Sequence, residues 1–188
     1  MQMEKKQIIV LRGEVKTSNQ HILRTNISTC VSVCLYHPLY AIGGITHISG
    51  SRKDDTSPSA KYIKTKKNFH YYADDAMPRL LYLLKKRRSS IRNRSLELVI
   101  VGGMDLRGPI LETLSELGLN VVNGERGNVG PKIRTLPGSK YGFKLVGHDI
   151  MQKFHRIVRF DTSSGIITVS RKVPFSVQKK IEPKTFYL

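Results

Sequence analysis

The sequence contains no tryptophan, only two cysteines, and fewer than half as many acidic residues as basic ones. Two cysteines do not make a disulfide framework. If Cys30 and Cys34 share one strand, their Cα atoms lie about 13 Å apart, beyond the roughly 7 Å limit for a bridge. Cysteine and histidine do not cluster at the spacing of a zinc site. We therefore expect neither a structural metal nor a cofactor.

Long apolar runs are also missing. A bilayer span needs roughly 20 apolar residues, and the run from Leu98 to Val101 is far shorter. The apolar stretch near the N-terminus, Gln7 to Leu11, is too short for a signal peptide and favours a first strand. We therefore expect a cytoplasmic protein without membrane insertion. Its 188 residues predict a single domain over residues 1–174. A polar C-terminal tail, for which disorder is one possibility, is expected over 175–188.

The shortage of acidic residues leaves a formal charge of +18, from 32 basic and 14 acidic side chains. Such a charge favours an acidic partner without naming it. Basic residues form one block over residues 85–94 and another over 61–67. Basic blocks with interleaved aromatic residues can bind nucleic acid, and solvated surface loops explain them equally well. The aromatic residues near the second block are Tyr62, Phe69, Tyr71 and Tyr72.

The hydrophobic pattern predicts strands first and helices later. Strand-like segments run near residues 7–15, 21–27, 30–36 and 41–49, and a polar surface loop follows over 51–67. A helix is expected from Asp74-Asp75 to about Arg87, with Pro78 tolerated in its first turn. Its buried stripe would contain Ala76, Leu80, Leu83 and Leu84.

In the second half of the chain, further strands are interspersed with a helix. A buried strand over residues 96–101 ends at Gly102-Gly103, a pair that lacks a phosphate-binding motif and favours close backbone packing. A helix over 109–117 ends at Gly118, and a strand follows over 119–122. Residues 123–140 contain too many glycines and prolines for a regular element, and 154–161 with 165–171 predict a hairpin. This order favours an α+β fold of packed layers rather than a doubly wound parallel sheet.

Cys30 and His47 are the residues with the most chemical information. His37 to Tyr40 predict a turn between two short strands, so Cys30 and His47 can come together in one hairpin. A thiol beside an imidazole is what a cysteine nucleophile requires. Either residue alone is more often structural, and for Cys34 we expect only a small buried side chain.

These residues resemble a known family. The segment from Thr25 to Tyr36, then Pro38, Gly43-Gly44 and His47, is similar to the signature of the chemoreceptor glutamine deamidases (the CheD family), approximately T-x-L-G-S-C-V-A-V-C-L-Y-D-P followed by G-G-x-x-H. Three further blocks look like the family's helix start, central strand and C-terminal hairpin. They are Tyr72 to Ala76; Val101 to Met104; and Asp149, Arg156, Val158, Phe160 and Gly165.

The resemblance implies a layered α/β/β sandwich of the cytotoxic necrotizing factor type and a cysteine hydrolase that acts on side-chain carboxamides. Cys30 would be the nucleophile, His47 the general base and then acid, and Thr25 the third polar member. The implied substrates are glutamines on the cytoplasmic helices of methyl-accepting chemotaxis receptors. A CheC-type phosphatase is the implied regulatory partner.

The chain departs from the family at several positions. Ser28 replaces the glycine two residues before the nucleophile, and a positive φ at this position would strain it. His37 stands where aspartate is usual. Two other readings stay open: a non-catalytic adaptor on the same fold that binds receptors or a phosphatase, and a basic nucleic-acid binder.

Overall fold

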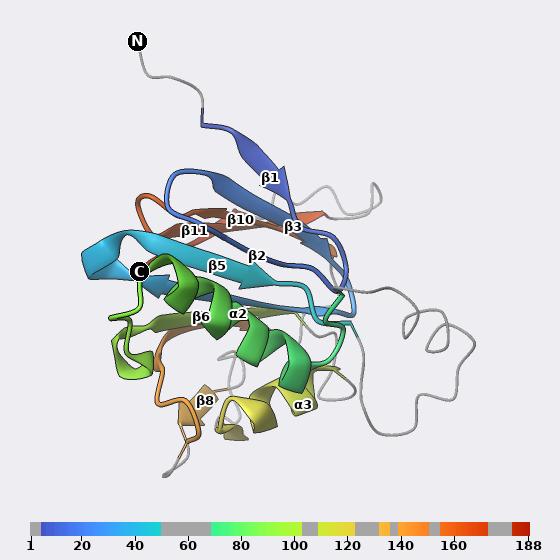
Figure 1. The fold of residues 1–188 in the computed structure, drawn as a ribbon. Helices are drawn as coiled ribbons and strands as arrows, with labels where there is room; N and C mark the ends of the chain where they lie inside the picture. The colour runs from blue at the N-terminus through green and yellow to red at the C-terminus, as the bar shows by residue number, and fades with distance from the viewer. Residues whose placement is uncertain are drawn as a thin grey trace.

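The computed structural model describes residues 5–49, 69–102, 109–122, 132–135, 139–150, 155–172 and 182–188. The fold is α+β, with two mixed sheets of five strands, a two-stranded sheet and two α-helices among these residues. Three layers are visible in Figure 1: the helices α2 and α3, a central sheet, and an outer sheet. No helix in this part of the chain is long and apolar enough to cross a membrane.

The central sheet has the strand order β2-β5-β4-β6-β9, and only β6 and β9 run parallel. Strand β4 is buried along its whole length because helices cover one face of this sheet and the outer sheet covers the other. Its strands are β2 (Val15–Ser18), β4 (Val31–His37), β5 (Ile42–Thr46), β6 (Glu97–Gly102) and β9 (Lys144–Ile150).

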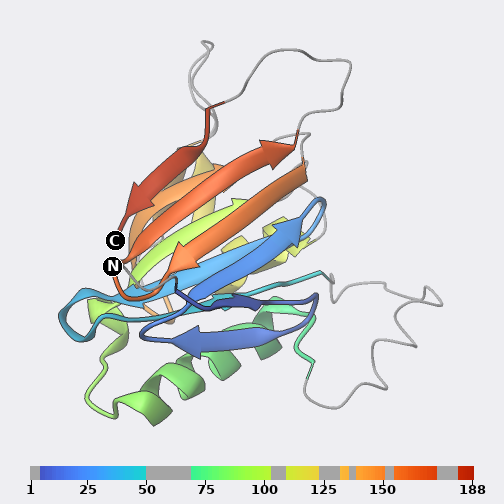
Figure 2. The same cartoon turned by 90° about the horizontal axis from the view of Figure 1, so that it is seen from above.

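The outer sheet has the order β1-β3-β10-β11-β12 and lies in front of the central sheet in Figure 2. Strand β3 alternates buried and more exposed side chains, as expected for a strand with one face on the core. Its strands are β1 (Gln7–Ile9), β3 (Ile22–Ile27), β10 (His155–Asp161), β11 (Ile166–Lys172) and β12 (Lys184–Tyr187).

Two hydrophobic cores hold the layers together. One lies between the helices and the central sheet, where Leu80 and Leu84 of α2 (Ala73–Arg87) pack with Val33 and Leu35 of β4. The second lies between the two sheets and contains Leu23, Ile45 and Phe160. Strands on both sides therefore shield the side chains of this second core.

The segment over residues 7–15, predicted as one strand, is two strands in different sheets. Gly13, with φ +79°, lies in a tight turn closed by a hydrogen bond from the Glu14 N–H to the Leu11 carbonyl (2.9 Å). The turn sends β1 to the outer sheet and β2 to the central sheet. It also places residues 11–14 beside the end of β5.

Helix α2 begins one residue earlier than predicted, with Tyr72 as its N-cap and no side-chain capping bond. Pro78 consequently lies in the second turn instead of the first. Leu81 is buried, whereas Leu83, expected in the buried stripe, is half-buried. Helix α3 (Pro109–Glu116) and the glycine that follows it, with φ +65°, agree with the prediction.

Three strands were not expected from the sequence. Strand β8 (Lys132–Thr135) pairs with β7 (Leu119–Val122), so the absence of regular structure predicted over 123–140 is wrong there. Strand β9 was not predicted at all. Strand β12 pairs with β11, which shows that the segment after Pro174, expected as a polar tail over 175–188, adds a strand to the outer sheet. The loop predicted over 51–67 lies outside the described residues.

A buried ion-pair cluster joins the two sheets. Asp149 of β9 accepts hydrogen bonds from Arg156 Nε (3.0 Å) and from Arg171 Nη2 (2.8 Å), both on the outer sheet. Arg156 is fully buried and Asp149 is 3% exposed. Because charges in such a position need their counter-charges, this cluster fixes how the sheets face each other.

We predict that Asp149→Asn lowers the free energy of unfolding by about 3–5 kcal/mol, because it removes the negative charge that lies against the buried Arg156 guanidinium. The control is Glu97→Gln, which breaks a pair whose Lys144 side chain is 69% exposed. Such a surface pair is worth about 1 kcal/mol or less. Urea unfolding followed by circular dichroism measures both, and equal losses would contradict the role of the cluster.

Candidate active site

Strands β4 and β5 form the predicted hairpin, and its open end holds the candidate site. Val31 and Ile48 exchange both backbone hydrogen bonds (2.8 Å each), so they lie directly opposite each other. Extending this register by one residue beyond β4 puts Cys30 opposite Ser49 and makes His47 its diagonal neighbour. Diagonal neighbours share one face of a sheet with Cα atoms about 7–8 Å apart. Cys30 packs against the core between the sheets, and the hydrogen bond of His47 to β3 places its ring in the same layer.

Thr25 determines the protonation of the His47 ring. The Thr25 hydroxyl has one hydrogen and donates it to the Val10 carbonyl (2.8 Å). His47 Nδ1 lies 2.8 Å from the same hydroxyl oxygen, which is left to accept. Nδ1 therefore carries the ring hydrogen, and Nε2 presents a lone pair.

Nε2 of His47 is buried and has no hydrogen-bond partner among the described residues. The His47 residue is 6% exposed, and burial lowers its pKa from 6.5 to about 4. A hydrogen bond with the Val10 backbone carbonyl raises this pKa, and the positive charge of Arg12 lowers it further. At neutral pH the ring is uncharged, so it can accept a proton but has none to give at Nε2.

Cys30 is half-buried at the entrance to β4. Burial raises the pKa of its thiol, while a hydrogen bond with the Thr29 hydroxyl and the charge of Arg12 lower it. No hydrogen bond joins the thiol to His47 Nε2 in this structure. The two groups are therefore a neutral thiol and a neutral imidazole in one layer, not an ion pair. Catalytic hydrogen bonds are often long before substrate binds.

Gly102 sets the backbone position of Cys30. Gly102 has φ +127°, and a Cβ atom there would overlap the Cys30 carbonyl oxygen. Only glycine lets β6 approach the start of β4 this closely. Close backbone packing, predicted for the Gly102-Gly103 pair, is therefore confirmed for Gly102; Gly103 lies outside the described residues.

The loop before Cys30 presents free donors. Within the part of the chain that the structure describes, neither the Thr29 nor the Cys30 backbone N–H donates a hydrogen bond. Both are available for an oxyanion. Ser28 is not strained, because Ala41 is the one non-glycine residue with positive φ among the described residues.

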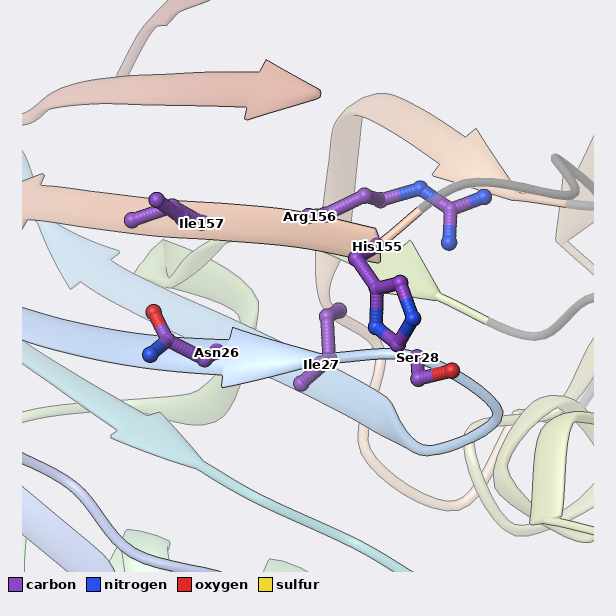
Figure 3. Close-up of a pocket in the computed structure, with 6 residues that line it drawn as sticks. All are labelled: Asn26, Ile27, Ser28, His155, Arg156 and Ile157. Atoms are coloured by element: carbon purple, nitrogen blue, oxygen red, sulfur yellow. The ribbon is translucent and has the colours of Figure 1, made fainter. Parts of the chain in front are cut away.

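A shallow depression of about 360 Å³ lies at the end of β3 and the start of β10, and Figure 3 shows the residues that line it. Asn26 and Ile157, cross-strand neighbours on its wall, alternate with the core-facing Ile27 and Val158. They therefore project from the outer face of the outer sheet, opposite to Thr25. The depression is lined by Asn26, Ile27, Ser28, His155, Arg156 and Ile157, and we assign it no part in the candidate site.

The basic block over 85–94 is partly structural. Arg87 bonds to the hydroxyl and carbonyl oxygens of Thr17, and Arg88 lies over the Tyr40 ring at 4.9 Å. These contacts attach the end of α2 to the central sheet. Of the aromatic residues considered for base stacking, Tyr71 is buried and stacks on Phe69 (5.7 Å). Tyr62 and the block over 61–67 lie outside the described residues.

Two contributors to the site were not found from the sequence. The Val10 carbonyl orients Thr25, and Arg12 changes the pKa of both Cys30 and His47. Both lie at the break between β1 and β2, which the apolar pattern did not reveal. The Gly13 that follows Arg12 was the available signal for a turn.

No family model matches the chain, and no curated protein matches its sequence.

We predict that iodoacetamide alkylates Cys30 more slowly at pH 7 than a free peptide thiol, at a rate that keeps rising up to at least pH 9. The raised thiol pKa lowers the thiolate fraction. Cys34 should not react in the folded protein, because burial raises the pKa of its thiol to about 12. Mass spectrometry of labelled peptides measures both. A rate plateau between pH 5 and 8 would indicate an ion pair and contradict the neutral assignment.

We also predict acid-sensitive stability from His47. Its folded pKa, about 4, lies below the ordinary value of 6.5, so the unfolded chain binds more protons between these pH values. The neutral ring contributes to the free energy of unfolding above pH 6.5, and this contribution is lost as pH falls through 4. The loss is on the order of 3 kcal/mol. Urea unfolding of wild type and His47→Gln from pH 7 to 4 measures the difference. Parallel curves for the two proteins would refute it.

Proposed function

We propose that this chain is a cysteine hydrolase that deamidates glutamine side chains of proteins, as a diverged relative of the chemoreceptor glutamine deamidases with their layered α/β/β fold. One observation carries the proposal: the Thr25 hydroxyl holds the Nδ1–H tautomer of His47, so that an unpartnered Nε2 shares the inter-sheet layer with Cys30. A buried ring nitrogen that lacks a partner is costly for a purely structural histidine, and it is what a general base requires.

The first half of the reaction forms a thioester. As the sulfur of Cys30 attacks the glutamine Cδ, His47 Nε2 takes the thiol proton, and the carbonyl π electrons move to oxygen. The Thr29 and Cys30 backbone N–H groups stabilise this oxyanion. The imidazolium then donates its proton to the departing nitrogen, the C–N bond breaks, and ammonia leaves.

The second half releases glutamate. The neutral ring removes a proton from water, the hydroxyl oxygen attacks the thioester carbon, and the C–S bond breaks as the sulfur recovers the proton. The imidazolium forms only during the two proton transfers, which agrees with the lowered pKa of His47. The Thr25 oxygen accepts from Nδ1–H throughout, the role that a carboxylate has in other triads.

The substrate and partners follow from the resemblance. On this proposal the substrates are glutamines on the cytoplasmic helices of chemotaxis receptors, the partner is a CheC-type phosphatase, and the protein acts in the cytoplasm. A net charge of +18 supports an acidic substrate, because it raises the rate of encounter at low salt.

A second candidate is a non-catalytic adaptor for the same receptors or phosphatase. The observation that favours it is the raised thiol pKa together with the absence of a hydrogen bond between Cys30 and His47. On this alternative the Thr25–His47 bond only joins the sheets.

Activity distinguishes the two candidates. We predict that incubation with a recombinant receptor fragment adds one dalton per converted glutamine, that Cys30→Ala abolishes the conversion, and that His47→Gln slows it by about 10²–10⁴. Thr25→Val should lower the rate of conversion by an intermediate amount, because it removes the hydroxyl oxygen that accepts from Nδ1–H. The matched control Thr25→Ser keeps this oxygen and should keep the activity. Mass spectrometry of the fragment measures conversion. Equal ammonia release by wild type and Cys30→Ala would eliminate the hydrolase.

A further inference from the structure

The turn at residues 11–14 is built tightly. Leu11 and Glu14 are joined twice, by the backbone bond described above and by the Leu11 N–H, which donates to Glu14 Oε2 (2.9 Å). A Cβ atom on Gly13 would lie 2.7 Å from the Tyr71 ring, so glycine is required by both space and φ. Arg12 occupies the second position of this turn.

The same turn is bonded to both backbone groups of His47. The Gly13 N–H donates to the His47 carbonyl (2.8 Å), and the His47 N–H donates to the Glu14 carbonyl (3.2 Å). The Gly13 carbonyl accepts from the His70 N–H (2.6 Å). The backbone of Arg12 is therefore held at a fixed position beside the general base.

The Arg12 side chain is exposed, and no carboxylate pairs with it in the described part of the chain. Its backbone is held beside His47 by the two bonds of the turn, and its positive charge lowers the pKa of both Cys30 and His47. Guanidinium groups bind carboxylates through two parallel hydrogen bonds.

We propose that Arg12 forms an anion-recognition subsite at the mouth of the Cys30–His47 site, and that it binds the carboxylate of an acidic residue beside the target glutamine. This substrate preference rests on the function proposed above, whereas the subsite itself does not. Arg12 touches the substrate away from the scissile amide, so it sets specificity without taking part in proton transfer.

The subsite is tested first with two alkylating reagents that differ in charge. The Cys30 thiolate attacks the methylene carbon of either iodoacetate or iodoacetamide and displaces iodide, so the ratio of the two rates cancels any change in thiolate fraction. We expect Arg12→Gln to lower the iodoacetate-to-iodoacetamide rate ratio about three- to tenfold, and Arg12→Lys to lower it less. The effect should shrink with added salt.

Arg159→Gln is the matched control, because it removes the same charge from an exposed position on the outer face of the outer sheet. Its ratio should equal that of wild type. A ratio that is unchanged in Arg12→Gln, or lowered equally in Arg159→Gln, would overturn the subsite.

The substrate preference is tested with two peptides that differ only in having Glu or Ala beside one glutamine. Wild type should deamidate the Glu peptide with the higher kcat/KM, Arg12→Gln should lose this preference, and Arg12→Glu should prefer a Lys peptide. Deamidation of both peptides at rates independent of residue 12 refutes the preference and leaves the hydrolase intact. If neither peptide is deamidated, the hydrolase proposal is refuted. The alkylation ratio still tests the subsite in that case.

Discussion

The hydrogen bond between the Thr25 hydroxyl and His47 Nδ1 is the interaction on which the candidate site depends. It joins the outer sheet to the end of the β4–β5 hairpin, and it has a defined direction because the single hydroxyl hydrogen is committed to the Val10 carbonyl. A local backbone feature, the end of β1, thereby sets the protonation of a ring on another sheet. Without these acceptors beside Nδ1, either ring nitrogen could carry the proton, and Nε2 would not be defined as an acceptor.

Burial between the sheets sets the chemistry of the pair. The same shielding that raises the pKa of the Cys30 thiol lowers that of His47, so both groups are neutral when the site is empty. A neutral pair limits unwanted reactions of the thiol, since the thiolate is the nucleophile. Reaction then requires proton transfer during attack. This arrangement fits a hydrolase whose substrate completes the site. Arg12, whose charge lowers the pKa of both groups, is the residue for which we infer a role in substrate recruitment.

The parts of the fold that were predictable are those encoded over short distances. Pro38 in the turn and the alternating pattern of β4 define the hairpin, and the periodicity around Leu80 defines α2. Sequence alone could not pair β3 with β10, because strand order depends on contacts distant in the chain. Thr25 was predicted only from the family resemblance. Its hydrogen bond to the Val10 carbonyl could be found only from the three-dimensional fold. Arg12 was missed because an apolar stretch hid the turn that presents it.

The protonation of the His47 ring tests the account most directly. Nitrogen-15 NMR of the imidazole, assigned by comparison with His47→Gln, distinguishes a protonated from an unprotonated ring nitrogen. Between pH 6 and 8 we expect a neutral ring with hydrogen on Nδ1 and none on Nε2, and in Thr25→Val a loss of this single tautomer. A ring protonated on Nε2, or a cationic ring at pH 7, would contradict the proposed general base.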